Sequence, residues 1–355
     1  MYAWTVVLRM RSVIVATLAA TLAVAPAPAA ASCSLAGAAE PCLTPWLEDG
    51  ARLRALQPVA AEPDHARADH RVRSLAIVGG VYVTFMTWAH FAWYRDVQSL
   101  RGFEFSHESY FGLETYAGGA DKLGHAWANL VLGRVSSRLL RRGGWDQTTA
   151  AVLGGSLAWT LFLFVEYKDG FVYRFSPGDE VMNTAGAVMA VLLETQPRLD
   201  DLLDFRVAYA PSDEYLGLWR GEYHGTKKGN SLNIAEDYSG QTYFLALHLG
   251  AVPRPRSTPR AVATALDYLD LGVAFEARKF KPDAPPDAIP TQKLFVGVTV
   301  NLQRVFDRAL TGQRGRGARV GRQVAHGVFE VMSPPYTILP VAAASRAAPG
   351  PAPEQ

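Results

Sequence analysis

The sequence TTAAVLGGSLAWTLFLFVEYKDGFVYRFSPGDEVMN, residues 148–183, decides the fold of this chain. Its first half, up to Val165, carries no charge over about eighteen residues, which predicts a helix that is buried or crosses a membrane. Ser176, Pro177 and Asp179 then mark the start of another helix, because Ser is a preferred N-cap, Pro fits the first helical position and an acid suits the first turn. The stretch therefore predicts two helices joined by a short polar connection.

Apolar helices are also predicted on both sides of this stretch. Leu75 to Tyr94 is a run of about twenty residues in which His90 is the one side chain that can be charged near neutral pH. Its length, like that of the uncharged run ending at Val165, is enough to cross a bilayer. Lys122 to Leu140 and Gly178 to Glu194 predict two further helices, for which a membrane span and a buried core helix remain open alternatives.

The pattern changes beyond Leu199. Leu269 to Arg278 and Leu294 to Gln303 alternate between apolar and other residues, which is typical of strands with one buried face. Tyr243 to Leu249 and Phe329 to Met332 are shorter candidates. We therefore predict an α+β fold, with an apolar bundle of about four helices followed by a small antiparallel β-sheet.

The N-terminus has the features of a secretory signal. Arg9 and Arg11 precede an apolar run from Val13 to Ala25, and mostly small residues follow. We predict a signal peptide over residues 1–32, with a permanent membrane anchor as the alternative. An exported protein of the periplasm or of a membrane facing it is the expected result, with the inner or outer membrane left open.

The two cysteines allow competing interpretations. Cys33 follows Ser32 as in a lipoprotein signal, although Ala30 stands where a Leu is usual. A disulfide between Cys33 and Cys42 is also compatible with export, but a lipidated Cys33 would leave Cys42 unpaired.

The remaining chain divides by composition. We predict a polar lead-in (33–73), a helical domain (74–198), a β-rich C-terminal region (199–335) and a disordered tail (336–355), with a loose Gly- and Arg-rich segment at 311–322. The net charge of +2 argues against a nucleic-acid partner, which usually requires a basic face. Membrane lipids and other envelope components are the expected partners.

Polar residues gather at the ends of the apolar helices. Asp121 and His125 are four residues apart, as are Asp179 and Asn183, so each pair shares one helix face. Glu166 directly follows the uncharged run, where an acid is costly unless it has a partner. The sequence therefore predicts one polar cluster among apolar helices.

The residue types suggest three kinds of role. We expect catalytic roles for His125, Glu166 and Asp179, and ligation of a divalent cation by Asp121 and Asp169.

Lys122 and Arg174 are expected to bind phosphate on a lipid headgroup or a cell-wall precursor, with Asn183 and Ser176 as further ligand-binding groups. Ser176 is explained more simply as a helix cap than as a nucleophile.

The order of these motifs resembles a known group of proteins. Three motifs in order resemble those of the VanZ-like superfamily of small bacterial membrane proteins. They are Asp-Lys-x-x-His at 121–125, Glu166, and Arg-x-Ser-x-x-Asp-x-x-x-Asn-x-x-Gly at 174–186. Phe164 to Gly170 and Phe175 to Asp179 resemble more closely the YfiM-like family of periplasmic lipoproteins.

The segment Asp237 to Tyr243 also resembles longer members of that group. The resemblance implies an envelope protein with a helical core. It does not supply a reaction.

Two functions follow from the cluster. In the first, it is an active or ligand-binding site at the membrane surface. In the second, it is a structural network of ion pairs, such as Asp121 with Arg174 or Glu166 with Lys122, in a scaffold or partner-binding protein. The excess of acids over bases in the motifs favours the site and leaves enzyme activity open.

Overall fold

The structure is a computed structural model, and it describes residues 64–348 except 96, 98, 223–233, 282, 283, 286 and 314. The predicted signal peptide and the two cysteines lie outside the described residues.

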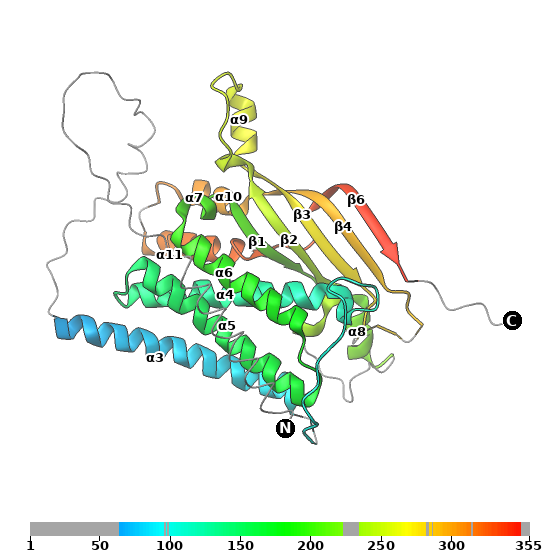
Figure 1. Cartoon of the computed structure of the whole chain (residues 1–355). Helices are drawn as coiled ribbons and strands as arrows, with labels where there is room; N and C mark the ends of the chain where they lie inside the picture. Colours follow the sequence, from blue (N-terminus) through cyan, green and yellow to red (C-terminus); the bar gives the residue numbers. More distant parts are fainter. Residues whose placement is uncertain are drawn as a thin grey trace, which may run out of the picture.

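The N-terminal half forms a layer of helices (Figure 1). Its long members are α3 (Asp64–Ala89, continued by a π-helical turn at His90–Tyr94), α4 (Ala120–Arg142), α5 (Gln147–Val172) and α6 (Pro177–Thr195). The helices α4, α5 and α6 pack against one another, while α3 lies along the outside of the group. The four predicted helices are therefore present, and α5 extends beyond the uncharged run to Val172.

Local sequence explains where these helices begin and how closely they pack. Ser176 caps α6, because its Oγ accepts a hydrogen bond from the backbone N–H of Asp179 at 3.2 Å. A Cβ atom on Gly186 would lie 2.0 Å from the carbonyl oxygen of Ala126, so only glycine allows α4 and α6 to approach this closely.

The C-terminal half forms a six-stranded sheet in the order β5-β1-β2-β3-β4-β6. Its strands are β1 (Leu203–Tyr209), β2 (Gln241–His248), β3 (Leu269–Arg278), β4 (Thr291–Val300), β5 (Met332–Ser333) and β6 (Leu339–Ala347). All neighbours are antiparallel except β1 and β5, which run parallel. The predicted α+β fold with helices before an antiparallel sheet is confirmed, and the sheet is larger than expected.

Short helices complete the second half. They are α7 (Pro197–Asp200), α8 (Asp213–Arg220), α9 (Arg260–Leu266), α10 (Leu302–Leu310) and α11 (Arg316–Phe329). The hairpin that carries α9 projects from the sheet (Figure 1).

Two predictions about the C-terminal region were wrong. Residues 336–355 were expected to form a disordered tail, but Leu339–Ala347 form β6, because backbone N–H and C=O groups can pair with β4 whatever side chains they carry. Pro340, which has no N–H, lies at the irregular register beside Gly297. Residues 311–322 were expected to be loose, but α11 begins at Arg316 and packs against α10.

The main core lies between α4, α6 and one face of the sheet. Phe205, Val207 and Tyr243 point from β1 and β2 toward the helices and contact a cluster that includes Leu130 of α4. Tyr243 reaches Gly124 at the start of α4, which anchors that end of the helix over the sheet.

Buried charges connect the far ends of the two layers. Arg134 of α4 is buried and contacts Glu194 at 3.0 Å, Asp200 at 2.5 Å and Glu330 at 2.9 Å. This network joins α4, α6 and α7 to the segment between α11 and β5.

Two described helical segments are long and apolar enough to cross a membrane, Ala68–Tyr94 and Gln147–Val172. The second is the helix α5, half of whose apolar window is buried by the rest of the protein, as in a core helix. The first is mostly exposed.

Candidate functional site

The predicted polar residues meet where the N-termini of α4 and α6 lie beside the C-terminal part of α5. Asp121 and His125 come from α4, Glu166 from α5, and Asp179 and Asn183 from α6. The four-residue spacing within α4 and α6 places each pair on one face. The packing of the three helices then brings these faces together.

His125 is held in a defined orientation. Its Nδ1 lies 3.0 Å from Oδ1 of Asn183, which also accepts a hydrogen bond from Asn129 Nδ2 at 2.7 Å. Because that oxygen can only accept, Nδ1 of His125 carries a hydrogen, and the neutral imidazole presents its lone pair at Nε2. This Nε2 lies 3.8 Å from Asp121 Oδ1 and 3.6 Å from Glu166 Oε1.

Lys122 is the other base of the cluster, and its side chain is fully buried. Its Nζ donates hydrogen bonds to Glu108 at 2.8 Å and to Asp179 at 3.1 Å. The sequence-based pairs, Asp121 with Arg174 and Glu166 with Lys122, are therefore wrong. The register of α4 turns Lys122 toward α6 and the segment before α4.

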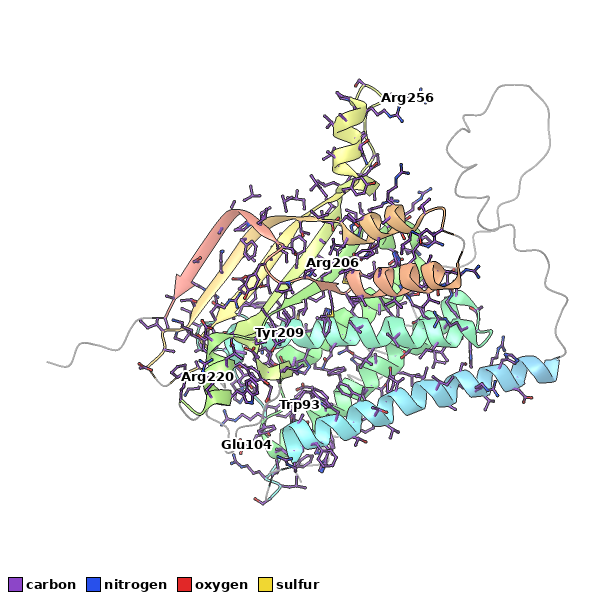
Figure 2. The ribbon with its side chains drawn as sticks, turned by 180° about the vertical axis from the view of Figure 1, so that it is seen from behind. Trp93, Glu104, Arg206, Tyr209, Arg220 and Arg256 are labelled. Atoms are coloured by element: carbon purple, nitrogen blue, oxygen red, sulfur yellow. The ribbon has the colours of Figure 1, made fainter. Side chains whose placement is uncertain are left out.

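These side chains surround a cavity of about 500 Å³. Its polar wall is formed by Asp121, His125, Glu166 and Asp179. The rest of its lining includes Asp169, Arg174, Ser176, Glu108, Glu236, Arg101, Trp93, Tyr116, Tyr173 and Tyr238. Figure 2 labels Trp93 at the C-terminal end of α3, away from Arg206 on the sheet. Lys122 and Asn183 lie behind the wall, in contact with residues that form it.

The electrostatics reflect buried carboxylates in close proximity. Burial and the neighbouring carboxylate of Asp179 raise the pKa of Asp121 to about 6. Burial also raises the pKa of Glu166 well above its usual value. Although burial opposes it, the carboxylates of Asp121, Asp179 and Glu166 raise the pKa of His125 to about 9. The cluster therefore carries more acid than its bases neutralise.

Three of these residues lie close enough together to hold one metal ion. One ligand atom each from Asp121, His125 and Asp179 can be chosen so that all lie within 4.8 Å of one another. One imidazole nitrogen with two carboxylates is a donor set for zinc, manganese or iron. The contact from His125 Nδ1 to Asn183 is the outer hydrogen bond that metal-ligating histidines usually make.

The other predicted site residues have different surroundings. Asp169 accepts a hydrogen bond from the hydroxyl of Tyr94 at 2.7 Å, and it is not one of the three grouped ligands. Arg174 is exposed and lies 3.4 Å from Glu104. Ser176 is a helix cap, and its backbone N–H also donates to Glu166 at 3.2 Å. The roles assigned to all these residues remain predictions.

Sequence reasoning missed several residues of the cavity. Glu108 and Arg101 come from the irregular segment before α4, which has no periodic pattern to place it. Tyr238 donates a hydrogen bond from its hydroxyl to Asp121. It belongs to the segment Asp237–Tyr243, whose resemblance to a family motif was the one available signal.

A second buried polar cluster on the sheet was also missed. His248 lies 2.7 Å from Asp270 and 3.1 Å from Asp204, and Arg206 contacts both acids. Asn301 donates to Asp270 at 2.8 Å. Every charge here has a partner of opposite sign, which indicates a structural network.

Comparison with known proteins gives one similarity. No curated protein and no solved structure matches the chain. Residues 107–195, which run from the segment before α4 to the end of α6, match a protein-family model described as "Predicted periplasmic lipoprotein (DUF2279)". The match includes the four residues of the polar wall and supports the expected periplasmic-lipoprotein resemblance, but not the YfiM or VanZ names. The chain is thus an exported protein of the periplasm or of a membrane facing it, with a segment similar to a predicted periplasmic lipoprotein family.

Proposed function

We propose that Asp121, His125 and Asp179 bind a divalent transition-metal ion, and that the cavity holds an anionic group of an envelope molecule against it. The observation that carries the proposal is the grouping of their ligand atoms within 4.8 Å. Asn183 supports it by accepting the hydrogen bond of His125 Nδ1, so that Nε2, the nitrogen directed toward the acids, is the one that becomes a ligand when it loses its proton.

The charge balance supports a cation at this position. Four acids (Asp121, Glu166, Asp179 and Glu108) face two bases (Lys122 and His125). Buried carboxylates without enough positive charge either take up protons or bind a cation. The raised pKa values of Asp121 and Glu166 describe the protonated alternative.

The rest of the cavity suits an anionic molecule of headgroup size. Arg101 and Arg174 are exposed residues of its lining, and guanidinium groups bind phosphate or carboxylate in paired hydrogen bonds. Trp93, Tyr116 and Tyr173 provide aromatic surface beside them. A phosphate-bearing lipid headgroup or cell-wall precursor has this combination of features.

The arrangement also supplies chemistry. A bound metal ion polarises a phosphoryl or carbonyl oxygen and lowers the pKa of bound water. Glu166 lies beside His125 and keeps its proton at higher pH than an ordinary carboxyl group, so it can donate a proton to a leaving group. Hydrolysis of an ester or phosphoester is the reaction class that these groups favour.

Metal titration of the purified, metal-depleted protein tests the proposal. Isothermal titration with Zn²⁺ and with Mn²⁺ should give one ion per chain, and His125→Ala or Asp121→Asn should weaken binding by about a hundredfold, since each removes a ligand. Asp169→Asn is the matched control and should bind like the unchanged protein. Because His125 is protonated at pH 7, binding should also release a proton, which the dependence on buffer ionisation enthalpy measures.

Equal affinity in all three variants would exclude this site.

The second candidate function is a structural network. It is favoured by the full burial of the Lys122 side chain and by its pairing with two carboxylates. In that case His125→Ala should unfold the protein, whereas a metal site predicts a folded variant that no longer binds the ion.

A further inference from the structure

A second cavity, of about 670 Å³, lies between α6 and the sheet. Its wall includes Met182, Ala185 and Met189 of α6 and Leu123 and Ala126 of α4. On the sheet side its lining includes Leu245, Val273, Leu294, Ala344 and Arg346. Cavities of this size with mainly apolar walls are typical of sites for small hydrophobic molecules.

The cavity exists because the sheet is wider than the helices that cover it. The core beneath the helices includes β1, β2 and the end of β3 at Phe275 and Ala277, but the same face continues through the rest of β3 and through β4 and β6. On this face Leu245 of β2, Val273 of β3 and Leu294 of β4 are 45%, 47% and 52% exposed. Large apolar side chains gathered in one exposed groove mark an interaction surface.

One charged residue lies on the wall of this cavity. Arg346 follows Ala344 on the same face of β6 and is exposed. Its Nε donates to Gln292 at 2.5 Å and its Nη2 to the carbonyl of Phe111, while Nη1 makes no hydrogen bond with any residue that the structure describes. The wall contains no acid among the described residues. An apolar groove with a single guanidinium at one end is complementary to an amphiphile with an anionic head.

We propose that this groove binds one acyl chain of an anionic amphiphile, with the chain against Leu245, Val273 and Leu294 and the carboxylate or phosphate at Arg346. Met182 and Met189 suit such a ligand, because their flexible side chains adapt to a mobile chain. A cationic ligand would find no partner on this wall.

The groove is independent of the proposed metal site. The two cavities have no lining residue in common, and α4 turns Asp121 and His125 toward one cavity and Leu123 and Ala126 toward the other. Acyl-chain binding can therefore be retained in the His125→Ala variant that loses the metal, and the two proposals can fail separately.

The test measures binding of palmitate and of palmitoyl lysophosphatidylglycerol to the delipidated, full-length mature protein, by displacement of a fluorescent fatty acid. Ala344→Trp places an indole in the groove and should weaken binding of both ligands by about tenfold or more, equivalent to about 1.4 kcal/mol. Val341→Trp is the matched control on the same strand. Val341 is 69% exposed and does not line the cavity, so affinity should not change.

The head is tested with Arg346→Gln and a neutral ligand. Arg346→Gln should weaken the binding of palmitate about fivefold or more and leave the binding of hexadecanol unchanged. Arg346→Lys, which keeps the positive charge, should retain part of the affinity for palmitate. Binding of palmitate alone or of the lysophospholipid alone would support the groove and identify the head as carboxylate or phosphate. The proposal is overturned if neither ligand binds, or if Ala344→Trp and Val341→Trp behave alike.

Discussion

Replacing Lys122 with Met separates the two candidate roles of the polar cluster. The side chain of Lys122 is fully buried, and its Nζ contacts Asp179 and Glu108 at 3.1 and 2.8 Å. Methionine has a similar length and no charge, so Lys122→Met leaves both carboxylates without their cation. Removing one partner of a buried ion pair usually costs about 3 to 5 kcal/mol. We expect a loss near the lower value, because Glu108 is partly exposed and can recover water.

The pH dependence gives this prediction a sign. Although burial opposes it, the nearby carboxylates raise the pKa of Lys122 above its usual value. A base with a raised pKa stabilises the folded state below its unfolded pKa of about 10.4, and the contribution is lost as the pH rises through the folded pKa. The difference between the two proteins should therefore be full at pH 7 and diminish above about pH 10.4.

Urea unfolding followed by circular dichroism measures the difference. Lys168→Met is the matched control. The amine of Lys168 lies 3.6 Å from the centroid of the Tyr94 ring, whose hydroxyl donates to Asp169 of the cavity lining. Such a cation–π contact is worth about 0.5 to 1 kcal/mol. If the site binds a metal, Zn²⁺ should restore part of the stability of Lys122→Met, since the ion supplies the missing positive charge. A loss below about 1 kcal/mol, or equal losses in the two variants, would refute the reasoning.

Three further predictions concern the rest of the fold. Glu330→Gln removes a carboxylate that pairs with two arginines of α4, and it should lower the free energy of unfolding by about 3 kcal/mol in urea titrations. Although burial opposes it, the carboxylates of Asp204 and Asp270 raise the pKa of His248 to about 9. The contribution of His248 to stability is therefore full below about pH 6.5 and is lost as the pH rises through 9. In the variant His248→Gln, the melting temperature should fall less over that pH range than in the unchanged protein. Gly186→Ala would place a Cβ 2.0 Å from the carbonyl oxygen of Ala126 and should lower the free energy of unfolding by about 1 to 3 kcal/mol in urea titrations. A Cβ on Gly80 would meet nothing within 4 Å, so Gly80→Ala should leave that free energy unchanged or raise it by up to about 1 kcal/mol.

The sequence predicted the helices well because their signals are local. The uncharged run ending at Val165 and the cap formed by Ser176 and Asp179 specify α5 and α6 without reference to the rest of the chain. The alternating stretch Leu269 to Arg278 likewise predicted β3, and the stretch Leu294 to Gln303 predicted most of β4 but ran beyond its end at Val300 into α10. The strand β6 was missed because its run of alanines has no alternation, and it becomes a strand through its pairing with β4.

For the candidate site, the four-residue spacings predicted which side chains share a face but not which faces meet. The pairs Asp121/His125 and Asp179/Asn183 follow from helical geometry. The partner of Lys122 depends on where the segment containing Glu108 crosses the helix ends, and no sequence pattern places that segment.

By itself, the sequence determined export, an apolar helical layer followed by a sheet, and the identity of the acids and bases at the helix ends. These properties depend on composition and on spacings within one element, which the chain carries locally. Tertiary structure alone decided that His125 faces Asp121 and Glu166, with its Nδ1 bonded to Asn183. It also decided that Lys122 pairs with Glu108 and Asp179. It also decided that part of the sheet's apolar face stays open beside Arg346. The reason is physical: charge pairing and cavities depend on distances between elements, and those are set when the helices and strands pack.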